Sequence, residues 1–208
     1  MVSKDEYLRN PCRVASIPYW KAVSITVPKN IKIVHEDVFC ADMLEHYTDE
    51  SYFRLLHDLQ EVEPAEVPRG YSLCQGTFDE FAAHIDGCYG NGMTSAEIQS
   101  FAEREVYCPE LWLALRDKKT GEIVASGIAD LDQKIGEGIL EWIQVSKEYR
   151  GHGLGGYIVS QLLWRMMGKA KFATVSGQCN NPTNPEALYR KCGFTGNDVW
   201  HIMRKIAE

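Results

Sequence analysis

The stretch Val145-Ser-Lys-Glu-Tyr-Arg-Gly-His-Gly-Leu-Gly-Gly156 combines a strand end, a glycine-rich turn and the expected start of an apolar helix. The first N–H groups of a helix have no partner within the helix, and the helix dipole places about half a positive charge there. Glycines let a ligand approach these amides without a clash against Cβ atoms. The stretch therefore predicts an anion site, suited to a phosphate or a pyrophosphate.

The same stretch matches the dinucleotide pattern Gly-x-Gly-x-x-Gly at Gly151, Gly153 and Gly156. In that pattern the glycines follow the strand almost directly, and an acidic residue comes about 20 residues later. Here residues 146–150 intervene, and after Gly156 no Asp or Glu occurs before Glu186. The context argues against a dinucleotide fold.

The chain on both sides of the turn reads as alternating strands and helices. Two apolar runs around a short Gly-containing loop at 117–122 indicate a β-hairpin, and Thr77 followed by Glu80 indicates a capping box. The expected order is strand 71–75, helix 77–89, helix 94–105, strands 111–116, 123–129 and 138–145, helix 157–167, strand 172–176, helix 184–192 and strand 199–204. This order predicts a mixed α+β fold with helices on the sheet.

The first third of the chain gives weaker signals. We expect residues 1–30 to be irregular and 31–36 to form a short strand, while 52–59 fits a strand or a helix equally well. Residues 61–70 are acidic and Pro-rich, which is typical of a connector. We therefore expect an N-terminal extension or partial second domain over 1–67 and a main domain over 68–208.

Composition excludes several classes of protein. The formal charge of −7 argues against a general nucleic-acid binder and leans towards cationic partners. No apolar run is long enough to span a membrane, and the first 30 residues lack the apolar segment of a secretory signal. Seven cysteines without a CxxC pair predict reduced thiols in the cytoplasm, with neither a disulfide framework nor a metal site.

Two motifs in the correct order resemble the GNAT superfamily of acetyl-CoA-dependent N-acetyltransferases. Arg150-x-x-Gly153-x-Gly155 is similar to its pyrophosphate-binding signature, and Tyr189-x-x-x-Gly193-Phe194 to its second signature. By chance alone, a chain of this size would contain roughly 0.2 matches to the first signature and roughly 0.02 matches to the second. The occurrence of both is therefore specific. The resemblance covers about residues 70–205.

The resemblance implies a mixed, mostly antiparallel central sheet flanked by helices, with acetyl-CoA as co-substrate and no metal. Pantetheine would lie along the backbone near Ile143 and Val145, where a backbone N–H could also face the developing oxyanion, and the turn would wrap the pyrophosphate. The family's Asn is often seven residues before the Tyr, where this chain has Pro182. Asn180, Asn181 and Asn184 are candidates to replace it. The implied coenzyme-binding residues are Ile143, Val145, Arg150, Gly151, His152, Gly153, Leu154, Gly155, Gly156 and Asn184.

The resemblance also implies direct acetyl transfer in a ternary complex. An aliphatic amine is neutral in only roughly 1 of 2,500 molecules at pH 7, so a general base is useful. Glu141 is our candidate because period 2 places it on the face of Ile143 and Val145, and Glu137 is second. Water stays open as an alternative. Tyr189 is commonly the general acid of the family, protonating the leaving thiolate.

Three alternatives stay open. The same fold could use another acyl-CoA or an O-acceptor, or it could be a coenzyme A-binding sensor or interaction module without turnover. The acceptor is an unidentified small-molecule or protein amine, and the acidic charge leans weakly towards polyamines, aminoglycosides or lysine side chains. We expect no nucleic-acid and no membrane partner, and a homodimer is left open.

Overall fold

Alternating apolar runs and short turns build the sheet of the segment that carries the glycine-rich turn. A computed structural model of the chain describes residues 2–206 and divides it into two units. We call Asp58–Ala173 the turn unit, and Met1–His57 with Thr174–Glu208 the terminal unit. The expected boundary near residue 67 stays a prediction, although residues 61–70 are irregular as a connector should be.

The turn unit contains a four-stranded antiparallel sheet in the order β6-β5-β4-β3. The expected hairpin around 117–122 is confirmed, because β4 and β5 pair on either side of this loop. The strands are β3 (Tyr71–Cys74), β4 (Trp112–Asp117), β5 (Ile123–Asp132) and β6 (Glu137–Val145).

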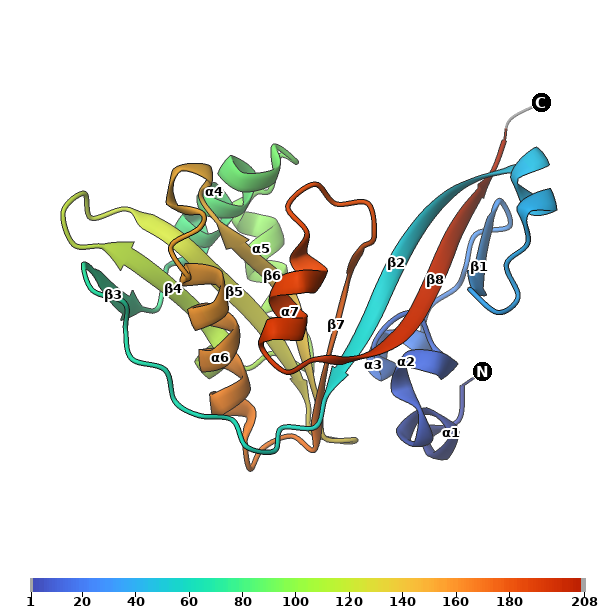
Figure 1. The fold of residues 1–208 in the computed structure, drawn as a ribbon, viewed down its shortest axis with the longest axis horizontal. Helices are drawn as coiled ribbons and strands as arrows, with labels where there is room; N and C mark the ends of the chain where they lie inside the picture. Colours follow the sequence, from blue (N-terminus) through green and yellow to red (C-terminus); the bar gives the residue numbers. More distant parts are fainter. Residues whose placement is uncertain (1, 207–208) are drawn as a thin grey trace. The chain divides into compact units, whose positions relative to one another are not determined.

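Helices cover both faces of this sheet (Figure 1). Helices α4 (Phe78–Tyr89) and α5 (Ser95–Phe101) lie on one face, and α6 (Leu154–Met166) lies on the other. Both α4 and α5 begin with a capping box, formed by Thr77 with Glu80 and by Thr94 with Glu97. These caps satisfy N–H groups that the helix leaves unpaired, which explains where both helices begin.

The two faces of the sheet bury different cores. Under α4 and α5, Phe81, Ile85 and Ile98 pack with Trp112 and Ile128. On the opposite face α6 lies so close to β5 that a Cβ atom at Gly127 would come within 2.4 Å of Ile158. The small residue therefore sets the distance between α6 and the sheet.

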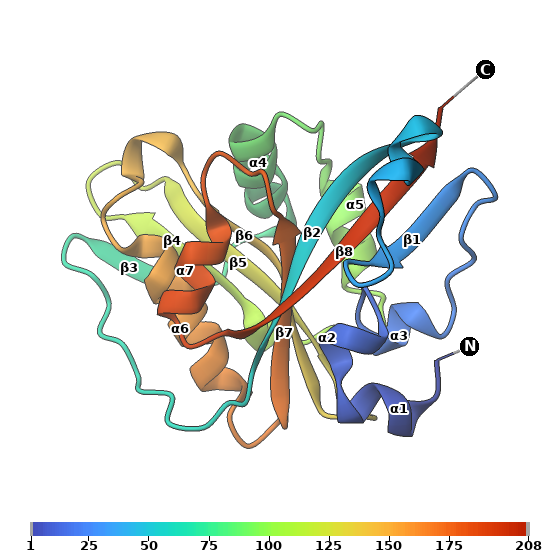
Figure 2. The same cartoon turned by 45° about the vertical axis from the view of Figure 1, so that its right-hand side comes forward.

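The terminal unit has strands in the order β1-β8-β2-β7, and both β1 and β2 pair antiparallel with β8. Figure 2 shows β2 and β8 as long neighbouring strands with β1 along the other edge of β8. Residues 52–59, which fitted a strand or a helix, lie mostly in a strand. The elements are β1 (Ile31–His35), β2 (Tyr47–His57), β7 (Phe172–Gln178), helix α7 (Pro185–Lys191) and β8 (Thr195–Lys205).

The expectation that residues 1–30 are irregular is wrong. They contain three short helices, α1 (Lys4–Arg9), α2 (Pro11–Val14) and α3 (Tyr19–Ala22). Ser3 caps α1, and Asn10 caps α2 with Pro11 in its first position. These are ordinary helix-start signals, but each helix is too short to show an apolar period. The α+β class with mostly antiparallel strands and flanking helices is confirmed.

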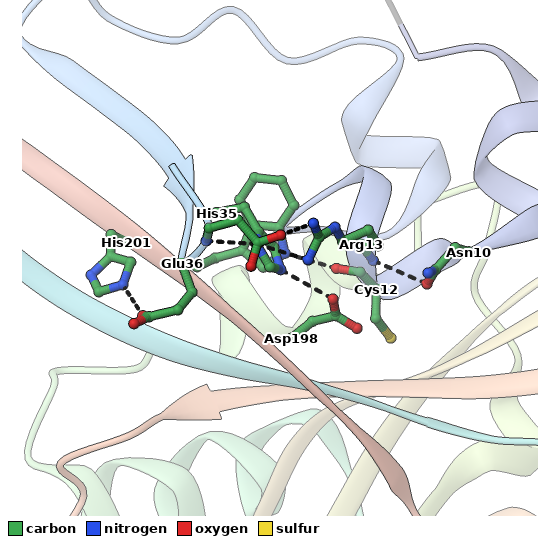
Figure 3. Close-up of polar contacts among 9 residues, drawn as sticks. Asn10, Cys12, Arg13, His35, Glu36, Asp198 and His201 are labelled. Carbon is green, nitrogen blue, oxygen red and sulfur yellow. Dashed lines mark hydrogen bonds and ion pairs between the residues drawn. The ribbon is translucent and has the colours of Figure 1, made fainter. Parts of the chain in front are cut away.

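A network of histidines and carboxylates joins β1, β2 and β8 of the terminal unit. Figure 3 shows two of its contacts, between His201 and Glu36 and between His35 and Asp198. The ring nitrogens of His201 lie 2.6 Å from Glu36 Oε2 and 2.8 Å from Asp49 Oδ2, and the ring stacks on Phe39. His35 Nε2 lies 3.0 Å from Asp198 Oδ1. Burial lowers the pKa of His201, but its hydrogen bonds with Glu36 and Asp49 outweigh burial and raise that pKa overall.

We predict a pH-dependent contribution of His201 to stability. Because the folded-state pKa is raised, the contribution is fully present below the unfolded value of about 6.5 and is lost as the pH rises through the folded value. In urea unfolding, wild type should exceed His201→Gln in free energy of unfolding near pH 6, and the difference should shrink towards about pH 9. The exposed His46, changed to Gln, is the control. A difference that is constant with pH would contradict the prediction.

Candidate functional site

The glycine-rich turn leads directly from the end of β6 to the start of α6. Val145 ends the strand, Ser146 precedes a 3₁₀ turn over Lys147–Tyr149, and Gly153 is the N-cap of α6. The helix begins at Leu154, three residues earlier than the expected 157, so Gly155 and Gly156 lie in its first turn. The turn therefore has the strand–turn–helix form that the sequence predicts.

Two glycines of the turn are required by the backbone. Gly151 and Gly153 have φ of +80° and +77°, a region that side chains with a Cβ atom rarely adopt. Within the described residues, no atom lies within 4 Å of a Cβ atom built at either position. Packing therefore does not exclude a side chain here, and the space beside the backbone stays open to a ligand.

The start of α6 presents backbone donors for which the helix itself supplies no acceptor. The N–H groups of Leu154 and Gly155 lie in the first helical turn, where a helix supplies no acceptor. No side chain among residues 2–206 caps this end, and α6 has no acidic residue in its first turn. The positive end of the helix dipole is thus available to an anion.

Arg150 adds positive charge next to these donors. Its side chain is exposed, and its Nε donates to the carbonyl oxygen of Val145 at 3.2 Å. His152 is also exposed, with Nδ1 3.2 Å from the carbonyl oxygen of Tyr149. The guanidinium is therefore held at the turn by a backbone contact and still faces solvent.

Two carbonyl groups near the end of β6 already accept from side chains. The carbonyl of Val145 accepts from Arg150, and the carbonyl of Ile143 accepts from the hydroxyl of Tyr89 at 3.3 Å. A ligand that bonds to either carbonyl would have to share it with these side chains. This bears on the expected contact of pantetheine with this strand, which stays a prediction.

The strand is irregular at Glu141. In the pairing of β5 with β6, Ile128 lies opposite Trp142 and the next residue, Ala129, lies opposite Leu140, so Glu141 is an extra residue of β6. Such a bulge interrupts the alternation of side chains. The alternation of side chains therefore cannot be used to place Glu141 on the same face of the strand as Ile143. Its side chain is half-buried.

Glu137, the second candidate base, occupies a different environment. It begins β6, pairs with Asp132 on β5 and is fully buried. It lies at the opposite end of the strand from the turn. Along β6, Glu137 is therefore farther from the anion site than Glu141 is.

A polar cluster beneath the turn was not expected from the sequence. His84 on α4 is buried, with ring nitrogens 2.8 Å from Ser126 Oγ and 3.0 Å from Ser146 Oγ. Burial lowers its pKa to about 4. The only local signal in the sequence is the helical spacing of His84 and Cys88. Ser126 on β5 and Ser146, which follows β6, are both distant from His84 in the sequence.

The remaining predicted residues belong to the terminal unit. Tyr189 on α7 is buried, with its ring 6.2 Å from that of Phe53 and 5.7 Å from that of Phe194. Asn184 is the N-cap of α7, and its side chain accepts from the N–H of Ala187. The turn unit contains the turn residues with Ile143, Val145 and Glu141 near them, and it contains Glu137 at the far end of β6. The terminal unit contains Tyr189 and Asn184 on α7 and at its N-cap.

Residues 2–206 contain neither a cluster of metal-binding side chains nor a helix suited to a membrane. Across residues 2–206, no three His, Cys, Asp or Glu side chains gather in a way that could hold a metal ion. None of the helices in that range has the length and apolar character needed to cross a bilayer.

Residues 109–196 match the family model of the acetyltransferase (GNAT) domain. This segment contains β4, β5, β6, α6 and α7, and with them both motifs. This segment is thus similar to a GNAT acetyltransferase domain, which confirms the resemblance seen in the two motifs. A search of curated proteins finds no significant match.

Solved structures share this fold at low sequence identity. A GCN5-related N-acetyltransferase from Sphaerobacter thermophilus matches with a TM-score of 0.69 and 20% identity, over 84% of this chain and 58% of that one. A tandem GNAT protein from the clavulanic acid biosynthesis pathway matches with a TM-score of 0.63 and 17% identity, over 83% of this chain and 62% of that one. A GNAT-family acetyltransferase from Colwellia psychrerythraea matches with a TM-score of 0.59 and 14% identity, over 89% of this chain and 69% of that one. The chain spans less than two thirds of the first two structures.

Proposed function

We propose that this protein is an acetyl-CoA-dependent N-acetyltransferase whose glycine-rich turn binds the pyrophosphate of the coenzyme. The observation that carries the proposal is the open start of α6, with Gly151 and Gly153 at positive φ, within the segment that matches the GNAT domain. The acceptor is an amine, and transfer is direct within a ternary complex.

The residues of the turn fit a diphosphate. The donors of the first turn of α6, the exposed Gly151 and Gly153 and the guanidinium of Arg150 all favour negative charge. A charge at a helix start is stabilised by about 0.3–1 kcal/mol at an exposed site and by up to about 2 kcal/mol where it is partly buried. Several backbone donors acting together give a specific site for two phosphates.

The acceptor needs a group that removes its proton. When bound, acetyl-CoA supplies the acetyl thioester that the amine attacks. Keeping an aliphatic amine neutral at pH 7 costs about 4.6 kcal/mol, which a carboxylate that accepts the proton can offset. Glu141 is our candidate, acting directly or through water. Its place at a bulge supports this, because bulges re-aim side chains and are common beside active sites.

Tyr189 is proposed as the general acid that protonates the thiolate. The proposal rests on the resemblance of Tyr189-x-x-x-Gly193-Phe194 to the second motif of the family. A phenol with a pKa of about 10 can donate to a thiolate with a pKa of about 8.5. The packing of the ring against Phe53 and Phe194 restricts its orientation, which suits a positioned proton donor.

The location and the acceptor are inferred from charge and cysteine chemistry. All seven cysteines lie within residues 2–206 and none of them forms a disulfide there, which supports a reducing compartment such as the cytoplasm. The net charge of −7 favours a cationic amine as acceptor.

We predict that negative charge in the turn weakens coenzyme binding. Gly153→Asp and Gly153→Asn are matched variants, because both residues tolerate positive φ and differ mainly in charge. By calorimetry, CoA should bind Gly153→Asp about tenfold or more weakly than Gly153→Asn, the effect of roughly 1.4 kcal/mol. Thermal unfolding of the two variants should be similar.

Two outcomes would contradict the proposal. Equal CoA affinity for the two variants would place the pyrophosphate away from the turn, and no binding by wild type would remove the coenzyme altogether. Binding of acetyl-CoA without thiol release for any of a panel of amines would instead favour a sensor or interaction module.

We predict that Tyr189→Phe lowers kcat at least about tenfold and leaves the CoA affinity close to that of wild type, since only the proton donor is removed. The measurement is thiol release with an amine that gives turnover, together with calorimetry. Phe keeps the ring contacts of the site, so a loss of folding is not expected. Unchanged kcat would exclude Tyr189 as the general acid.

A further inference from the structure

A buried histidine connects the glycine-rich turn to the helix and the strand beside it. His84 extends from α4 and is 8% exposed. Its ring lies between the hydroxyl of Ser126 on β5, at 2.8 Å, and the hydroxyl of Ser146, at 3.0 Å. A neutral imidazole has one donor and one acceptor nitrogen, so it can bond to both serines at once.

Ser146 is the residue at which the strand becomes the turn. Its N–H donates to the carbonyl of Val124 at 2.9 Å, which continues the pairing with β5. Its carbonyl accepts from the N–H of Tyr149 at 2.9 Å, which closes the 3₁₀ turn. The side chain of Ser146 is thus the point at which His84 can hold the first part of the turn.

We propose that His84 is a positioning residue that fixes Ser146 and, through it, the conformation of residues 147–153 in which the coenzyme binds. The inference rests on the proposed function, because it assigns the cluster to the same anion site. Most of residues 147–153 is exposed and bonded locally, so the turn depends on its ends for order. If the turn adopts the binding conformation for a smaller fraction of the time, the apparent affinity for the coenzyme falls in proportion to that fraction.

The far end of the 3₁₀ turn has its own contact. The hydroxyl of Tyr149 hydrogen-bonds with Asp117, and its ring packs edge-on against Tyr71. Loss of His84 would therefore remove the side-chain contact at one end of the turn, where the backbone bond of Ser146 to Val124 would remain, and leave the other end unchanged. We expect a partial loss of order, not an unfolded segment.

The protonation states in the cluster agree with this role. With its pKa lowered to about 4 by burial, His84 is neutral at pH 7 and retains an acceptor nitrogen. Burial raises the pKa of Cys88, whose Sγ lies 3.7 Å from Nε2 of His84, so the thiol stays protonated. The cluster is thus a set of neutral hydrogen-bonding groups.

The test compares three variants of the full chain. His84→Leu removes both hydrogen bonds, and His84→Gln keeps an amide that can donate and accept. Gln161→Leu is the matched control, because Gln161 is also 8% exposed and donates one hydrogen bond, to the carbonyl of Ala65 at 2.9 Å, in the same unit. Hydrogen exchange of the peptide covering 146–153 and calorimetry with CoA are measured at pH 7, with thermal unfolding as the measure of stability.

His84→Leu should exchange about tenfold faster in 146–153 and bind CoA about fivefold or more weakly, the effect of one or two lost hydrogen bonds. His84→Gln should lie within about twofold of wild type in both measurements. Gln161→Leu should lower the thermal stability but leave both the exchange rate of 146–153 and the affinity for CoA as in wild type. Exchange in His84→Leu equal to that in Gln161→Leu would overturn the inference, even if CoA binds. Faster exchange in His84→Leu with no CoA binding by wild type would instead overturn the proposed function and leave the positioning role in place.

A second variant separates the contact from general destabilisation. If His84 acts through the hydroxyl of Ser146, Ser146→Ala should reproduce the faster exchange, and the double variant should exchange no faster than His84→Leu alone. Additive effects of the two substitutions would show that the hydrogen bond between them does not hold the turn.

Discussion

The first N–H groups of α6 are the feature on which the candidate site depends. The helix itself supplies no acceptor for the N–H groups of Leu154 and Gly155, which lie at the positive end of its 13 residues. Gly151 and Gly153 at positive φ leave the space beside them open. The strand before them, the 3₁₀ turn and the cluster around His84 all hold this helix start in place. A protein without an anionic ligand has little reason to leave such a surface uncapped.

The order of elements after residue 70 could be predicted because each one has a local cause. Capping boxes mark α4 and α5, and apolar runs around a Gly-containing loop mark the hairpin of β4 and β5. The terminal unit could not be predicted in this way. The helices of residues 4–22 are too short to show a period, and the pairing of β1 and β2 with β8 depends on residues far apart in the chain.

Some residues of the candidate site could be predicted from the sequence and others could not. The turn is continuous in sequence, and its glycines indicate the chemistry directly. The place of Glu141 is different, because a bulge exists only relative to the partner strand, and a period-2 reading assumes that it is absent. His84 was missed for a related reason. Its partners Ser126 and Ser146 are 42 and 62 residues away, and none of the three forms a motif.

The terminal unit is made from both ends of the chain, which affects how the protein can form during synthesis. His201 on β8 contacts Asp49 on β2 across 152 residues, so these strands cannot pair until β8 has left the ribosome. The sheet of β3–β6 uses neighbouring segments and can assemble earlier, since short loops close at a lower entropic cost. Until β8 emerges, the nascent chain exposes the edge of β2 that pairs with β8, so a chaperone that shields strand edges would act on this segment first.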